Sequence, residues 1–164
     1  MLMIDFLYLD LCTCERCIAT DKYLNEALVA LSGVLKMLKY DVKINKVEVS
    51  SRELAERYRL LSSPTIRVNG TDICGAIKEN ECKDCADISG NKVDCRIFTY
   101  NGKEYDQPPA PMIVEGILRA LYGVRDHAVK ESEYVLPDNL NRFFKSERPK
   151  GLRTSDILIM RRRA

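Results

Sequence analysis

The spacing of the cysteines constrains this chain more than any other feature of its sequence. Seven cysteines occur among 164 residues, in two separate groups. The first group comprises Cys12, Cys14 and Cys17, and the second comprises Cys74, Cys82, Cys85 and Cys95. Each group contains a C-x-x-C pair, a spacing typical of redox-active dithiols and of metal ligands. We therefore expect the fold to bring thiols together, and the chemistry of the protein to lie where they meet.

The N-terminal segment bears on the compartment in which these thiols act. Residues 1–10 are mostly apolar but contain Asp5 and Asp10, and they lack a basic stretch and a small-residue cleavage site. These features predict a buried strand and not a signal peptide. We therefore expect a cytoplasmic protein, in which thiols are kept reduced, so that redox chemistry or metal ligation is favoured over structural disulfides.

Composition limits the classes of partner. Hydrophobic residues make up 46% of the chain and charged residues 30%, which is typical of a globular protein. The formal net charge of +2 creates no strong field for attracting nucleic acid or anionic lipid. No apolar run approaches the roughly 18–20 residues that a membrane-spanning helix requires. We expect no membrane partner and no nucleic-acid partner.

The first half of the chain predicts alternating strands and helices. An apolar run at residues 2–9 predicts a buried strand, and residues 42–49 alternate as a half-buried strand does. Between them, five leucines recur at spacings of three and four over residues 18–39, which predicts a long amphipathic helix. A short helix is expected over residues 52–60, capped by Ser50 or Ser51. The stripe of leucines comprises Leu24, Leu28, Leu31, Leu35 and Leu38.

The second half predicts hairpins and two further helices. Asn-Gly pairs at 69–70 and 101–102 are typical of tight turns between strands. Pro111 opens an apolar helix, and a short helix is expected at Asp138–Lys145. The polar, cysteine-rich residues 74–95 are interpreted as an inserted loop that needs a cross-link to be ordered. The expected organisation is a domain over residues 1–123, including this insertion, and a C-terminal extension over residues 124–164.

The first cysteine group has the sequence context of a reactive dithiol. Cys14 and Cys17 stand where the first strand gives way to the long helix. The dipole and free N–H groups of a helix N-terminus favour a thiolate, so Cys14 is the expected nucleophile. Cys17, one turn later, is placed to attack the resulting mixed disulfide and resolve it. This pattern predicts thiol–disulfide exchange, with a disulfide-bearing protein or a small thiol as its substrate.

The order strand, C-x-x-C, long helix, strand, short helix and proline-led strand resembles the thioredoxin superfamily over about residues 2–123. The resemblance implies an α/β sandwich with a central mixed sheet of four main strands and helices on both faces. It also implies a cis bond before Pro64, with the Ser63–Pro64 loop lying against the C-x-x-C. The inserted Cys-Lys-Asp-Cys and the later Cys95-Arg96 further resemble an uncharacterised group of thioredoxin-like proteins, a domain of unknown function.

Cys12 opens an alternative for the first group, because it forms an additional C-x-C with Cys14. Three closely spaced thiols suit a soft ion such as Cu(I), Zn²⁺ or a trivalent arsenical. On this second hypothesis Cys12, Cys14 and Cys17 are the ligands of a metal or metalloid binding protein. A third interpretation is that Cys12 and Cys17 are simply small buried side chains.

The second group predicts a metal site or further disulfide chemistry. Four thiols at positions 74, 82, 85 and 95 suit a closed tetrahedral Zn²⁺ site that would order the insertion. The alternatives are two disulfides, a relay in which this group exchanges with Cys14 and Cys17, and an iron–sulfur cluster. The expected cofactor is structural zinc, and none is required for catalysis. Asp5, Asp10 and the single histidine, His127, are expected to be solvated residues outside the site.

Overall fold

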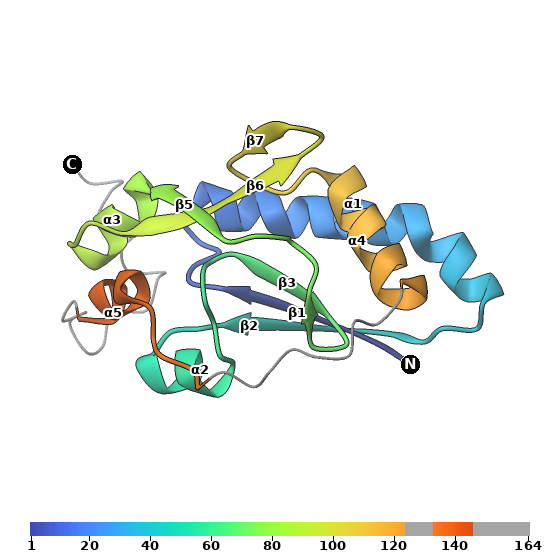
Figure 1. The fold of residues 1–164 in the computed structure, drawn as a ribbon, viewed down its shortest axis with the longest axis horizontal. Coiled ribbons are helices and arrows are strands. Elements are labelled where there is room, and N and C mark those ends of the chain that lie inside the picture. Colours follow the sequence, from blue (N-terminus) through green and yellow to red (C-terminus); the bar gives the residue numbers. More distant parts are fainter. Residues whose placement is uncertain (124–132, 146–164) are drawn as a thin grey trace.

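The computed structural model describes residues 1–123 and 133–145, which form two sheets and five helices (Figure 1). The larger sheet is mixed, with strand order β2-β1-β3-β4, and the smaller has the order β5-β6-β7. In the larger sheet β1 runs parallel to β2 and antiparallel to β3. In chain order the elements are β1 (Leu2–Tyr8), α1 (Glu15–Met37), β2 (Val42–Glu48), α2 (Arg52–Arg57), β3 (Thr65–Val68), β4 (Thr71–Asp72), β5 (Lys78–Glu81), α3 (Lys83–Ser89), β6 (Asp94–Tyr100), β7 (Lys103–Tyr105), α4 (Ala110–Tyr122) and α5 (Asp138–Phe144). This architecture is compatible with a thioredoxin-like α/β fold, as expected.

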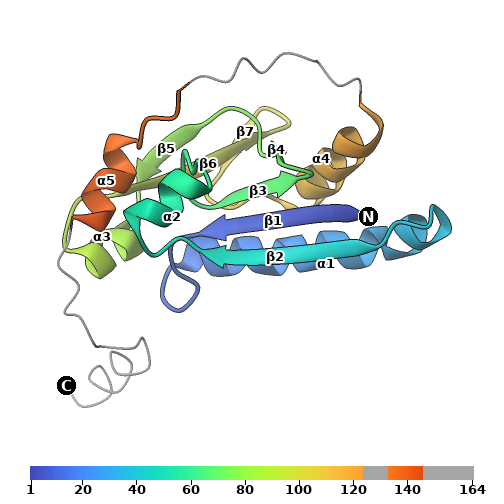
Figure 2. The same ribbon diagram turned by 90° about the horizontal axis from the view of Figure 1, so that it is seen from below.

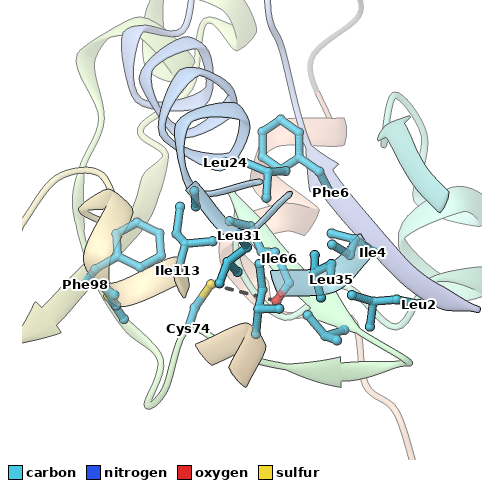
Figure 3. Close-up of a cluster of buried hydrophobic side chains, with 14 residues drawn as sticks. Leu2, Ile4, Phe6, Leu24, Leu31, Leu35, Ile66, Cys74, Phe98 and Ile113 are labelled. Atoms are coloured by element: carbon cyan, nitrogen blue, oxygen red, sulfur yellow. Dashed lines mark hydrogen bonds between the residues drawn. The ribbon is translucent and has the colours of Figure 1, made fainter. Parts of the chain in front are cut away.

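The main core lies between one face of the larger sheet and helices α1 and α4 (Figure 3). Alternate residues of β1 point to this face, as the period of two in a strand requires. The expected leucine stripe of α1 supplies the facing side chains, except that Leu38 caps the helix and is half exposed. The labelled core residues in Figure 3 are Leu2, Ile4, Phe6, Leu24, Leu31, Leu35, Ile66, Cys74, Phe98 and Ile113.

A second core forms at the end of the sheet where β1 ends. Figures 1 and 2 both place α2, α3 and α5 at this end, with α4 toward the other. Leu7 of β1 packs here with Val49, Leu60 and the buried face of α5. In Figure 2, α2 lies in front of one end of the larger sheet and α1 lies behind the sheet, so the two helices are on opposite faces. Strand β2 is more exposed than its alternating sequence predicts, since it forms the edge of the sheet.

Both expected Asn-Gly turns are present. Asn69 and Gly70 join β3 to β4, and Asn101 and Gly102 join β6 to β7. All four residues have positive φ, between 49° and 82°. A turn of this type requires positive φ at both central positions, which glycine and asparagine tolerate best. The Ser63–Pro64 bond that precedes β3 is cis, as the family resemblance implied.

The insertion is more regular than expected, because residues 74–95 contain strand β5 and helix α3 and not only loop. The four side chains of β5 are all exposed, and its backbone pairs with β6. Helix α3 ends at Gly90, whose φ of 70° supplies a left-handed C-cap. The lack of a buried face explains why hydrophobic patterning did not predict these elements.

Residues 133–145 include α5, which confirms the expected short helix. Its Asn139 accepts a hydrogen bond from the N–H of Asp94 at 2.8 Å, so α5 is attached to the start of β6. His127 and the basic residues at the chain end lie outside the described residues. No helix within residues 1–123 and 133–145 is both long enough and apolar enough to cross a bilayer.

Candidate metal centre

Four cysteine sulfurs converge in the second core. Cys14, Cys82, Cys85 and Cys95 are buried, and their Sγ atoms all lie within 4.8 Å of one another. The Sγ of Cys85 is 3.7 Å from that of Cys14 and 3.3 Å from that of Cys95. A tetrahedral ion with metal–sulfur bonds of about 2.3 Å needs sulfur–sulfur distances of about 3.8 Å. The four sulfurs therefore lie close to the spacing that a single tetrahedral ion requires.

Two of these cysteines begin helices. Cys14 is the N-cap of α1 and Cys82 is the N-cap of α3, and each opens a C-x-x-C motif. The two motifs are joined by a hydrogen bond of 2.8 Å, which the N–H of Glu15 donates to Oδ2 of Asp84. Since Glu15 lies inside the first motif and Asp84 inside the second, this bond holds the helix starts against each other. The N-terminal dipole of the long α1 favours negative charge on the Cys14 sulfur.

Strand pairing brings the fourth cysteine into place. Strands β5 and β6 are antiparallel, with Asn80 opposite Cys95. Cys82 directly follows β5, and its N–H donates to the carbonyl oxygen of Val93 at 2.9 Å. The antiparallel register therefore returns Cys95 to the start of α3, although it lies ten positions after Cys85 in the sequence.

Arg16, inside the first C-x-x-C, connects α1 to the backbone beside the other ligands. Its Nη1 donates to Oδ1 of Asn80 at 2.6 Å and to the carbonyl of Cys95 at 3.4 Å. Its Nη2 donates to the carbonyl of Glu81 at 3.3 Å and pairs with Asp106 at 3.1 Å. One side chain thus contacts both the strand that leads into Cys82 and the strand that carries Cys95. Arg16 positions the cluster without contributing a sulfur.

Asp10 orders the loop that delivers Cys14. Its Oδ1 accepts hydrogen bonds from the N–H groups of Cys12, Thr13 and Cys14 at 2.8, 2.6 and 3.3 Å, and from the Thr13 hydroxyl at 3.0 Å. The expectation of a solvated carboxylate is wrong for Asp10, which is only 3% exposed. Burial is tolerated here because the carboxylate oxygen is fully engaged by donors.

The four thiols strongly affect one another's ionisation. Contacts with Cys17 and then with the other cluster thiols hold the pKa of Cys14 well below its usual range, against the effect of burial. The pKa of Cys82 is lowered as well, because Cys85 and Cys95 together outweigh the opposing contact with Cys14. The pKa values of Cys85 and Cys95 are raised by the Cys14 and Cys82 thiols. Four adjacent thiolates would repel one another, and a bound cation would offset that repulsion.

Cys17 and Pro64, both expected in a redox site, lie beside this cluster. Cys17 is fully buried in the first turn of α1, three positions after Cys14. The neighbouring Cys14 thiol and burial raise the pKa of Cys17 well above its usual range. Its Sγ is 3.9 Å from Oγ of Ser63, the residue before Pro64. The structure thus places the expected nucleophile, resolving thiol and proline loop next to one another.

The remaining two cysteines lie elsewhere. Cys12 is exposed on the loop before α1, and its sulfur is not one of the four. Cys74 lies in the main core, with its Sγ 3.9 Å from the carbonyl oxygen of Ile66 (Figure 3). Burial raises the pKa of Cys74 to about 12. In the four-sulfur cluster, Cys14 therefore occupies the place that sequence spacing suggested for Cys74. All seven cysteines are free thiols.

Three positioning residues, Asp10, Arg16 and Asp84, were not predicted from the sequence. Asp10 does carry a local signal, because it stands shortly before Thr13 and the start of a helix. Asp side chains at such places accept hydrogen bonds from N–H groups two and three residues later. Arg16 and Asp84 carry no such signal, because their partners lie 64 or more positions away.

The fold and the site define a mixed α/β protein with a buried cluster of four cysteines that could hold a metal ion. Residues 2–117 match the family model of a domain of unknown function, DUF2703. Since the match spans more than half of the chain, the protein belongs to this family. The matched range contains the whole cluster. Neither the curated proteins nor the solved structures contain a match to the chain.

Proposed function

We propose that the protein binds one zinc ion through Cys14, Cys82, Cys85 and Cys95. The observation that carries the proposal is the convergence of four buried sulfurs within 4.8 Å, delivered by α1, α3 and β6. Thiolates select soft ions, and a tetrahedral set of four sulfurs suits zinc. A divalent cation also relieves the repulsion among the thiolates.

The close spacing favours a single ion over an iron–sulfur cluster. In a cluster, iron and sulfide ions lie between cysteines that bind different irons, so those cysteine sulfurs stand further apart than ligands of one ion. Here two sulfur–sulfur distances are 3.3 and 3.7 Å. Four protein ligands leave no open position for substrate, so the bound zinc would be structural and would fasten the insertion to α1.

The test is the metal content of anaerobically purified chain, measured by native mass spectrometry with elemental analysis. We expect one zinc per wild-type chain, its loss in Cys14→Ser, and its retention in Cys74→Val. The Cys74 variant is the matched control, because it removes a buried thiol outside the cluster. Wild-type protein that stays without metal after reduction and incubation with zinc would refute the proposal, as would a single iron or an iron–sulfur cluster.

A second candidate function is thiol–disulfide exchange by Cys14 and Cys17 in a cytoplasmic member of the thioredoxin superfamily. It is supported by the positions of these thiols, three residues apart at the start of α1, and by the Ser63 hydroxyl before Pro64, which lies 3.9 Å from the Cys17 sulfur. Cys14 is fully buried, so a protein disulfide reaches it only if the insertion moves. Under this proposal Cys14→Ser abolishes disulfide reduction and Cys12→Ser does not. Equal activity of wild type and Cys14→Ser would exclude it.

A further inference from the structure

Cys17 is a fifth thiol at the edge of the four-sulfur cluster. It is fully buried in the first turn of α1, three positions after Cys14, yet its own Sγ is not among the four that converge. Its other polar neighbour is the Ser63 hydroxyl, 3.9 Å away. Cys14 therefore belongs to two groups of cysteines, the four-sulfur cluster and the C-x-x-C pair with Cys17 at the start of α1.

Cys14 cannot bind a metal ion with the cluster and form a disulfide with Cys17 at the same time. A sulfur in a disulfide is no longer a thiolate and cannot serve as a metal ligand. Cys14 and Cys17 are three residues apart at the start of a helix, where side chains lie on the same face and within reach of each other. Joining them removes one ligand from the cluster and leaves Cys82, Cys85 and Cys95 unoxidised.

Resting on the proposed zinc site, we propose that a small peroxide oxidises Cys14 and Cys17 to a disulfide and that this reaction releases the metal. Peroxide is the oxidant class that fits the burial of the cluster. Cys14, Cys17 and Cys95 have no exposed surface, and Cys82 is 2% exposed. Hydrogen peroxide is close to water in size, whereas a protein disulfide needs an open surface at the attacking sulfur.

The reaction has two balanced steps. The Cys14 thiolate attacks one oxygen of hydrogen peroxide, the O–O bond breaks, and Cys14 sulfenic acid and hydroxide form. The Cys17 thiol then attacks the sulfenic sulfur, an S–S bond forms, and one water leaves with the Cys17 proton. Each cysteine sulfur is oxidised by one electron, and the two peroxide oxygens are reduced to hydroxide and water. Zinc loses its Cys14 ligand and dissociates from the remaining three.

A competing disulfide exists within the second motif. Cys82 and Cys85 are also three residues apart at a helix start, and both are cluster members. Their disulfide would remove two ligands at once and would not involve Cys17. The identity of the disulfide that accompanies metal release therefore separates the two routes.

The experiment treats the zinc-loaded full chain with hydrogen peroxide and follows released zinc with a chromophoric indicator, while peptide mapping identifies disulfides. We expect one zinc released per Cys14–Cys17 disulfide formed in the wild type. Cys17→Ser and Cys17→Ala should bind zinc but release it at least tenfold more slowly. Cys12→Ser is the matched control, since it removes an exposed thiol from the same segment, and it should release zinc at the wild-type rate.

The outcomes separate this inference from the proposed zinc site. A wild-type chain that binds no zinc at the start refutes the site itself. Zinc that binds but leaves at the wild-type rate from both Cys17 variants overturns the inference. A Cys82–Cys85 disulfide as the product in wild-type protein overturns it too, and this measurement needs no variant to fold.

Discussion

Replacing Arg16 with alanine tests how the cluster is held together. The Arg16 side chain is 14% exposed, and its guanidinium reaches Asn80, Glu81 and Cys95. A hydrogen bond from a charged donor contributes about 1.5–3 kcal/mol to stability. The Asn80 bond, at 2.6 Å, is assigned about 1.5 kcal/mol, and the two longer carbonyl bonds about 1 kcal/mol each. We therefore expect Arg16→Ala to lower the free energy of unfolding by about 3.5 kcal/mol.

The exposed partner of Arg16 adds little to this figure. Asp106 is 58% exposed, and ion pairs at such positions contribute about 0–1 kcal/mol.

The larger functional effect of Arg16→Ala is expected on zinc affinity. Residues that orient ligands without binding the ion typically change affinity by about 10–100-fold when they are removed. We expect zinc affinity to fall by a factor in that range.

The assay is competition for zinc with a chromophoric chelator, combined with urea unfolding in saturating zinc. Arg16→Lys should fall between wild type and alanine, because lysine keeps the charge but cannot reach three acceptors in a planar fork. Arg119→Ala is the control, since that arginine is exposed on α4 and pairs with Glu115 in the same helix. A folded Arg16→Ala variant with wild-type zinc affinity and wild-type stability would refute the positioning role.

Three further predictions concern protons, packing and the insertion. Zinc binding should release protons near neutral pH, because neighbouring thiols raise the pKa values of Cys85 and Cys95, so zinc affinity rises with pH; calorimetry in buffers of different ionisation enthalpy measures this, and no proton release would contradict it. Gly116→Ala should lower the free energy of unfolding by about 1–3 kcal/mol although alanine favours helices, because a Cβ there would lie 2.9 Å from Cβ of Ile73; a neutral result in urea unfolding would mean that α4 can shift. Chelation of zinc should speed amide hydrogen exchange in residues 78–95 more than in β1 and α1, and equal acceleration throughout would count against local fastening of the insertion.

Hydrophobic patterns predicted the parts of the fold that bury apolar surface. The run at residues 2–9 and the leucine stripe of α1 have the periods of two and about 3.6 that a core-facing strand and helix require. The Asn-Gly pairs located both tight turns because their backbone demands positive φ. Strand β5 and helix α3 carry no comparable signal, since one has only exposed side chains and the other buries only Cys85 and Ser89.

Sequence distance was a poor guide to which cysteines meet. Cys74 precedes Cys82 by eight positions, yet the turn after β3 leads into β4 and leaves Cys74 facing the main core beside Ile66. Cys14, 68 positions from Cys82, lies in the cluster. Loop-closure entropy grows only with the logarithm of loop length, so joining distant residues costs little more than joining near ones. Which of Cys74 and Cys14 joins the cluster depends on where each side chain is buried. That in turn depends on strand register, which the sequence pattern did not predict.

The weak hydrophobic packing of the insertion explains why a metal ion suits the four-sulfur cluster. Helix α3 has seven residues, too few to be stable without tertiary contacts. The insertion contributes few apolar side chains to the second core apart from its own cysteines, chiefly Val93 and the partly buried Ile88. Hydrophobic burial alone therefore holds the insertion weakly, whereas α1 and β1 rest on a large core. A bound ion would supply the missing free energy through Cys14 and so would couple the order of the insertion to the oxidation state of one sulfur.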